Sequence, residues 1–260
     1  MSRNKTTVIV GAILMIALGV TLVARAAVDS GIAGWWLFNE ASGITANDSS
    51  GSANDLHGTL VSTALFTTDA QRGNVLFVNG ASGEVDFPLS TELQPAVGTV
   101  SVWVKPSVAR LADIVRKPTD LLLRTNRTGN FYAYGLRVTS KGSPLAIIAN
   151  DDPKTSARQP QIVVQGPANL VKVGQWTHLV MRWDGAAVSL FANGKAAGFA
   201  RYIANPTLGL SYHGTAPMKV GAALWDFNNG YLEYSGMVSD LRIYSRALTE
   251  TEIRSIFNGQ

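Results

Sequence analysis

The segment that most constrains the fold is residues 174–195, which predict a β-hairpin followed by a second tight turn. Mostly apolar side chains recur at every second position, before Asp184-Gly185 in residues 177–183 and after it in residues 188–192. Asp-Gly and Asn-Gly pairs supply the positive backbone angles that a two-residue hairpin turn requires. Because Asn193-Gly194 is a second such pair, a further strand is expected directly after it. A chain built on this segment folds as antiparallel β-structure.

Turn-forming residues divide most of the remaining chain into short strand-like runs, about 8 to 12 residues apart, as in β-sandwiches. In residues 99–105, Val100, Val102 and Val104 fall on one face and the residues between them on the other, and Pro106 ends the run. Trp36 and Phe38 share a face and are assigned to the core. The other predicted strands are 75–78 and 83–87, paired around Asn79-Gly80, then 121–124, 132–138, 145–149, 161–165, 195–200 and 218–221, and residues 232–244, paired around Ser235-Gly236. Thr249 and Glu252 predict a capping box that starts a helix ending near Phe257.

Three segments resemble the laminin-G-like jelly rolls of the concanavalin A-like lectin and glucanase superfamily. Residues 175–195, with Gln-Trp-x-His-Leu-Val and Leu-Phe-Ala-Asn-Gly-Lys, are similar to the central hairpin of that family. Residues 36–60 resemble its opening strand and long loop, and residues 234–253 its closing strand and terminal helix. Since the three occur in the family's order, we expect an all-β, two-sheet antiparallel jelly-roll sandwich with a short C-terminal helix, preceded by an N-terminal signal or anchor segment.

The N-terminus has the pattern of an export signal. Arg3 and Lys5 precede an uncharged run from Val8 to Val23, and Ala24-Arg25-Ala26 offers the small residues that signal peptidase requires. We therefore expect residues 1–26 to be a signal peptide, residues 27–34 a short spacer and residues 35–260 the jelly-roll domain. An uncleaved anchor remains the alternative, and it would be the only link to a membrane.

Composition and charge limit the classes of partner that the chain can bind. The chain has 260 residues, of which 46% are apolar and 15% charged, and it has no Cys, which suits a single large β-domain without disulfides. Removing Arg3, Lys5 and Arg25 from the 22 basic residues leaves 19, against 18 acidic residues, so the net charge after position 26 is +1. Nucleic acid is thus excluded as a partner, because such binding requires a basic surface.

Catalytic constellations are absent from the sequence. Hydrolases of the resembling superfamily carry Glu-x-Asp-x-x-Glu or Glu-x-Asp-x-Glu on one strand, whereas Glu84 and Asp86 are followed by Pro88, Leu89 and Ser90. We interpret this pair as part of an exposed strand edge. There is no Cys or Gly-x-Ser-x-Gly elbow, and His57 and His178 are assigned structural roles, His57 as a backbone cap. No catalytic residue is therefore predicted.

The resemblance implies one structural calcium ion between the opening loop and the closing strand. Asp48 and Asp240 are the leading side-chain ligands, since calcium prefers carboxylate and carbonyl oxygens. The family commonly has a second carboxylate where this chain has Ser239, which implies weaker affinity. The alternative is that Asp48 makes only an Asx turn with Ser50 and Gly51.

Sugar recognition combines an aromatic ring that stacks on the sugar with amide or carboxylate groups that bind its hydroxyls. Two predicted loops have this mixture, and their candidate ligand residues are Trp225, Asp226, Asn228, Tyr212 and His213. We expect an exported, non-catalytic module, secreted or in the cell envelope, that binds a glycan or another extracellular surface. A structural or adhesive envelope protein acting through protein contacts is the second interpretation, and a glycoside hydrolase the third.

Overall fold

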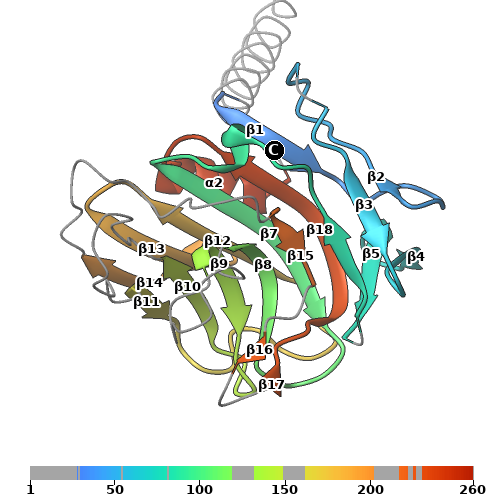
Figure 1. The fold of residues 1–260 in the computed structure, drawn as a ribbon. Helices are drawn as coiled ribbons and strands as arrows, with labels where there is room; N and C mark the ends of the chain where they lie inside the picture. The colour runs from blue at the N-terminus through green and yellow to red at the C-terminus, as the bar shows by residue number, and fades with distance from the viewer. Residues whose placement is uncertain are drawn as a thin grey trace, which may run out of the picture.

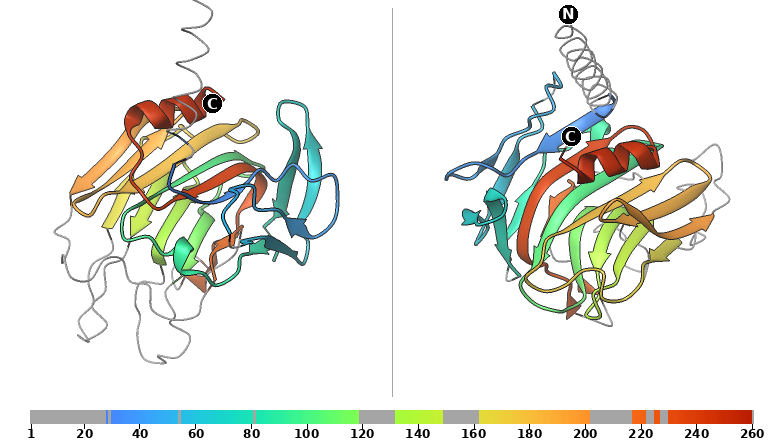
Figure 2. Two further views of the ribbon diagram at one scale, coloured as in Figure 1. Left: turned by 90° about the horizontal axis from the view of Figure 1, so that it is seen from above. Right: turned by 180° about the vertical axis from the view of Figure 1, so that it is seen from behind.

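The structure, a computed structural model, is a sandwich of two antiparallel β-sheets packed face to face (Figures 1 and 2). It describes residues 28, 30–53, 55–80, 82–118, 132–148, 162–201, 217–221, 225–226 and 230–259. Sheet A runs in the order β14 (Lys195–Arg201), β13 (Ala187–Ala192), β12 (Thr177–Trp183), β7 (Gly98–Pro106), β18 (Ser235–Tyr244), β5 (Gly73–Asn79) and β4 (Leu65–Asp69), and β1 (Ile32–Trp36) also pairs with β18. Sheet B runs in the order β11 (Ile162–Gln165), β10 (Pro144–Ile148), β9 (Tyr132–Val138), β8 (Ala112–Pro118), β15 (Lys219–Val220), β6 (Glu84–Asp86), β3 (Gly58–Val61) and β2 (Thr45–Ala46).

The predicted central hairpin is confirmed. Strands β12 and β13 pair in register from Leu179 opposite Ala192 to Trp183 opposite Val188. The carboxylate of Asp184 accepts hydrogen bonds from two amides of the following turn, those of residues 186 and 187. Asn193 and Gly194 have φ angles of 50° and 71°, so this pair makes the second turn that leads into β14.

The core lies between the sheets, and the alternation in the sequence determines which side chains enter it. Val100, Val102 and Val104 are fully buried there, as are Trp36 and Phe38, which confirms their assignment. The indole of Trp36 donates to the carbonyl of Leu56 at 2.8 Å, so the polar atom of this core side chain is satisfied.

A second, smaller core lies on the outer face of sheet A, under α2 (Glu250–Phe257). Ile253 and Ile256 of the helix pack there against side chains of β12, β13 and β18, and the buried side chain of Val28 joins them. The helix begins at the predicted capping box of Thr249 and Glu252 and ends at Phe257, so both predictions are confirmed. The helix therefore covers part of one sheet only (Figure 2).

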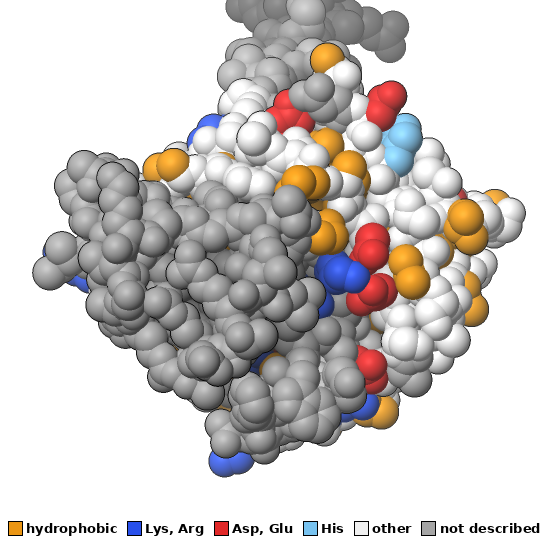
Figure 3. Space-filling view, in the orientation of Figure 1, with side chains coloured by type: hydrophobic (Ala, Val, Ile, Leu, Met, Phe, Trp, Pro, Cys, Tyr) orange, Lys and Arg blue, Asp and Glu red, His pale blue; other side chains and the backbone are white. Residues whose placement is uncertain are grey.

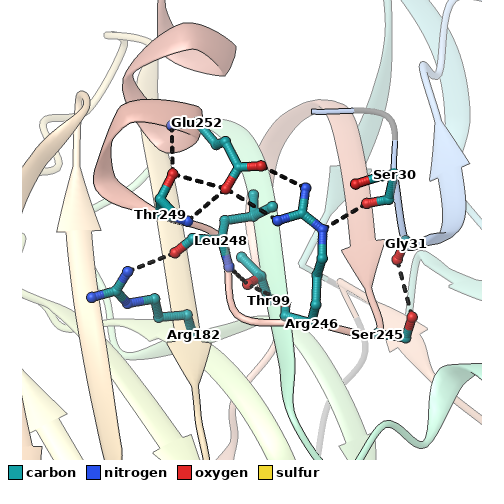
Figure 4. A network of polar contacts seen from close by, with 9 residues as sticks. All are labelled: Ser30, Gly31, Thr99, Arg182, Ser245, Arg246, Leu248, Thr249 and Glu252. Carbon is teal, nitrogen blue, oxygen red and sulfur yellow. Dashed lines mark hydrogen bonds and ion pairs between the residues drawn. The ribbon is translucent and has the colours of Figure 1, made fainter. Parts of the chain in front are cut away.

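Polar contacts join the start of the domain to this helix (Figure 4). Arg246 donates to the carbonyl of Ser30 at 2.7 Å and pairs with Glu252 at 2.7 Å. The amide and hydroxyl of Ser245 both donate to the carbonyl of Gly31. The two ends of the domain are therefore held side by side.

Two predicted strand pairings are wrong. Strands β5 and β6 do not pair around Asn79-Gly80, because β5 belongs to sheet A and β6 to sheet B. Residues 235–244 form one continuous strand instead of a hairpin around Ser235-Gly236. At Asn79-Gly80 the turn-forming residues lie where the chain passes from one sheet to the other, and Ser235-Gly236 lies at the start of a strand. The local sequence does not distinguish either case from a hairpin turn.

Other boundaries differ in detail. Strand β1 begins at Ile32, within the predicted spacer, and strands β4 and β8 had no counterpart among the predicted runs. The predicted signal segment 1–26 and the predicted strand 121–124 lie outside the described residues. Where the structure describes the chain, no helix has the length and apolar character needed to cross a bilayer.

Candidate functional site

One arginine joins three connections between strands. The Arg110 Nε donates to the carbonyl of Glu233 at 2.8 Å, and its Nη2 donates to the carbonyl of Gly80 at 3.0 Å. The carboxylate of Glu233 accepts from the amide of Ser82 at 3.2 Å. These contacts tie the β5–β6, β7–β8 and β17–β18 connections together, and they make a rigid base at one end of the sandwich. Nothing in the local sequence pattern marks Arg110.

A small two-stranded hairpin closely precedes Glu233 in the chain and lies at the bottom of Figure 1. Strand β16 (Trp225–Asp226) pairs with β17 (Gly230–Tyr231), with Trp225 opposite Tyr231. The chain leaves β17 through Leu232, whose carbonyl accepts from the amide of Asp113 at the start of β8. The structure thus places the backbone of two candidate ligand residues, Trp225 and Asp226, on a hairpin anchored to sheet B. Asn228, Tyr212 and His213 lie outside the described residues.

The carboxylates of Glu84 and Asp86 flank a lysine on the outer face of sheet B. The Lys219 Nζ lies 2.6 Å from an oxygen of each. Strand β6, which carries both acids, lies between β15 and β3 and is not the strand edge that the sequence suggested. Figure 3 shows such a mixture of acidic and basic side chains in the middle of one face. Hydrolysis needs room for a water or a glycosidic oxygen between its two carboxyl groups, and here an ammonium group lies against both.

The candidate calcium ligand Asp48 is held by amides of its own neighbourhood. Its Oδ1 accepts from the backbone amide of Trp35 at 3.0 Å and from that of Ser50 at 2.9 Å. The second contact is the Asx turn that the sequence left open as the alternative. The amide of Asp48 in turn donates to the His57 ring at 2.9 Å, in the backbone-capping role expected of that histidine.

The other candidate ligand, Asp240, pairs with an arginine. Its two carboxylate oxygens accept from Arg242, at 2.8 and 3.1 Å, and Oδ1 also accepts from the indole of Trp35 at 2.7 Å. A calcium ion shared by Asp48 and Asp240 would have to displace Arg242, so these contacts do not fit a metal held by both carboxylates. Within the described ranges, no group of three or more His, Asp or Glu could hold a metal ion.

His178 is a core residue of the outer face of sheet A. It is fully buried, its Nε2 lies 2.8 Å from the hydroxyl of Ser101, and its ring packs against those of Trp103 and Phe257. Burial lowers the pKa of His178 from 6.5 to about 3, an effect that Asp240 opposes and that Arg242 and Arg72 reinforce. The ring is therefore neutral and structural at physiological pH.

Comparison with known proteins supports the fold. A family model described as the concanavalin A-like lectin/glucanases superfamily matches residues 79–254. No protein with a curated description matches the sequence.

Three solved structures illustrate the likeness. Domain 4 of AbnA, an extracellular GH43 arabinanase from Geobacillus stearothermophilus, in complex with arabinotriose, has 17% identity and a TM-score of 0.54, covering 86% of this chain and 97% of that one. The ligand-binding domain of botulinum neurotoxin serotype D, in complex with N-acetylneuraminic acid, has 13% identity and a TM-score of 0.63, covering 91% and 53%. A Trypanosoma rangeli sialidase in complex with 2,3-difluorosialic acid has 15% identity and a TM-score of 0.56, covering 88% and 33%. This chain thus spans about half the length of the toxin domain, and at such identities the likeness shows the jelly-roll fold alone.

Proposed function

Because the chain belongs to the concanavalin A-like lectin/glucanase superfamily, as a domain of the laminin-G type, we propose that it is an exported, non-catalytic module that binds a carbohydrate. The proposal names the loops around β16 and β17 as the binding region, with Trp225, Asp226, Asn228, Tyr212 and His213 as contact residues. The structural neighbours include domains solved with arabinotriose and with sialic acid, which supports the ligand class.

The observation that carries this proposal is the hairpin of β16 and β17 on its cross-linked base. An aromatic residue and a carboxylate occupy adjacent positions on it, at Trp225 and Asp226. A sugar site needs such a pair on a backbone that does not rearrange, because ordering a loop on binding costs affinity. The Arg110 contacts support such a backbone, since they hold the connection that follows the hairpin, at Glu233, to the connection that contains Gly80.

The assignment of a non-catalytic role rests on Lys219. With its ammonium group 2.6 Å from one oxygen of Glu84 and one of Asp86, Lys219 occupies the position between the two carboxylates where hydrolysis would need a water or a glycosidic oxygen. Export is inferred from the predicted signal segment and agrees with the extracellular enzyme that contains the arabinanase domain.

A structural or adhesive role is the second candidate, and one feature favours it. Strand β14 lies at the edge of sheet A, and its Phe199 is 61% exposed. An edge strand presents backbone N–H and C=O groups with which a strand of another protein can pair, and Phe199 would add apolar contact area to such an interface.

A glycan array with the purified protein, in calcium and in chelator, tests the first candidate. We expect selective binding to one group of glycans, at least tenfold weaker in Trp225→Ala and in single alanine variants of the other named contacts. Phe199→Ala is the matched control, because it removes an exposed aromatic side chain far from the hairpin in sequence. Absence of binding to any glycan, with loss of surface adhesion in Phe199→Ala, would support the adhesive role instead. Hydrolysis of β-glucans that Glu84→Gln abolishes would contradict both.

A further inference from the structure

We propose that Arg72 and Trp176, on the outer face of sheet A, form a second binding site, for a saccharide that carries a carboxylate. The site extends the proposed function to acidic sugars, and it shares no residue with the β16–β17 hairpin. We call Asp69, Arg72, Trp103, Lys105 and Trp176 the Arg72 platform.

Asp69 organises the Arg72 platform. It ends β4 and is 6% exposed, and its Oδ2 pairs with Lys105 on β7 at 2.6 Å. Its Oδ1 accepts from the indole of Trp176 at 2.8 Å and from the amides of Gln71 and Arg72 at 2.9 and 3.2 Å. One buried carboxylate therefore fixes the turn that carries Arg72 and, from a segment 107 residues away, the ring of Trp176.

Arg72 is the cation of the platform that forms no ion pair with a carboxylate of the described residues, although Asp69 and Asp240 are near enough to act on its charge. Its guanidinium carbon lies 4.2 Å from the centre of the Trp103 ring and 5.4 Å from that of Trp176. Its Nε is buried without a hydrogen-bond partner among the described residues. Both nearby carboxylates are paired elsewhere, Asp69 with Lys105 and Asp240 with Arg242. The guanidinium group is thus held by ring stacking rather than by an ion pair.

The balance of charge on this part of the face favours an anion. Lys105, Arg72 and Arg242 bring three positive charges, and Asp69 and Asp240 bring two negative ones. Arg72 and Trp176 are half-buried, so solvent reaches both. The excess cation therefore lies at a surface beside a Trp ring and is already oriented.

The chemistry of the two side chains specifies the ligand class. A guanidinium group binds a carboxylate through two parallel hydrogen bonds, which are stronger than bonds between neutral groups. The ring of Trp176 offers an apolar surface to the C–H face of a sugar. A uronic acid presents both features at neighbouring positions, whereas a neutral sugar or a free anion presents only one.

Calorimetric titration of the purified protein with tri-galacturonic acid tests the site, with the indole N–H signal of Trp176 followed by NMR. We expect the Trp176 signal to shift on titration, and Arg72→Met to weaken binding at least tenfold. Arg72→Lys, which keeps the charge but not the planar fork, should retain an intermediate affinity. Arg254→Met is the matched control, because Arg254 is an exposed arginine on α2. The affinity of this variant for tri-galacturonic acid should equal that of the wild type.

Four results would each overturn the proposal. They are a wild type that does not bind tri-galacturonic acid, equal affinity in wild type and Arg72→Met, competition by free acetate at the same concentration, and tighter binding of a sulfated trisaccharide. Loss of tri-galacturonic acid binding in Trp225→Ala but not in Arg72→Met would place acidic sugars at the hairpin. That result would leave the proposed function intact while rejecting this second site.

Discussion

The outer face of sheet A contains two similar groups of side chains that differ in one partner. In each, a tryptophan indole donates to an aspartate and an arginine lies over the ring, as with Trp35, Asp240 and Arg242 at 2.7 and 4.6 Å. In the other group, Trp176 donates to Asp69 at 2.8 Å, but Lys105 takes the ion pair and Arg72 keeps no carboxylate. In the first group the arginine and the aspartate bind each other, so we call it the closed group and assign it a structural role. In the second group the arginine is available to bind a ligand. The partner of the aspartate, rather than the residue types, decides which role an arginine has.

The largest expected effect comes from breaking the closed group. Arg242→Met leaves the buried Asp240 without its cation, and losing one partner of a buried pair costs about 3–5 kcal/mol. Arg72→Met should cost only about 0.5–1 kcal/mol, the size of a cation–π contact. Urea denaturation measures both, and equal losses of stability would contradict the comparison.

The next effect is a dependence of stability on pH through His178, which lies beside both groups. Because its pKa is about 3 in the folded state and 6.5 when exposed, the unfolded chain takes up a proton first as the pH falls. This contribution to stability should therefore be present above the unfolded pKa of 6.5 and should fall by about 2 kcal/mol by pH 5. His178→Gln should lose this part of the dependence, and the His178 ring signals of the folded wild type should not titrate between pH 7 and 4.

The carboxylate of Asp69 should give stability a smaller dependence on pH, in a lower pH range. Burial alone would raise its pKa, but hydrogen bonds from Lys105, Trp176 and Gln71 lower it from 3.8 to about 2. The stabilisation is present above pH 4 and is lost as the pH falls towards 2. Allowing for the partial exposure of Lys105, we expect it to be about 1 kcal/mol. The difference in stability between wild type and Asp69→Asn should thus shrink between pH 4 and 2, and a constant difference would show that the carboxylate charge is not involved.

Calcium should have the smallest effect on this face. Since Arg242 occupies both oxygens of Asp240, we expect melting temperatures in calcium and in chelator to agree within about 1 °C. The same measurement on Asp48→Ala should show a loss of Asx-turn stability that does not depend on calcium, because alanine has no side-chain oxygen to accept from the amides of Trp35 and Ser50. A drop of several degrees in chelator, absent from Asp48→Ala, would instead establish the metal that the resemblance implies.

Local signals in the sequence predicted the parts of the fold that local physics determines. Turn residues with positive φ at Asn193 and Gly194, the alternation of Val100, Val102 and Val104, and the capping box of Thr249 and Glu252 each act within a few residues. Their consequences, a hairpin, a core-facing strand and a helix start, follow from backbone sterics and side-chain period alone. The order of the three segments that resemble the family predicted which class of β-sandwich the chain forms.

Tertiary structure alone decided which sheet each strand joins and which charges meet. Nothing near Asn79 states that β5 and β6 part into different sheets, because strand pairing is made with residues far along the chain. In the same way, the sequence does not reveal that Asp240, the predicted metal ligand, contacts Arg242 and also Trp35, 205 residues away. No sequence pattern marked Arg72 as a binding residue, because its proposed role depends on the ion pair between Asp69 on β4 and Lys105 on β7. The physical reason is that electrostatic partners are chosen by distance in space, and the packing of the two sheets sets that distance.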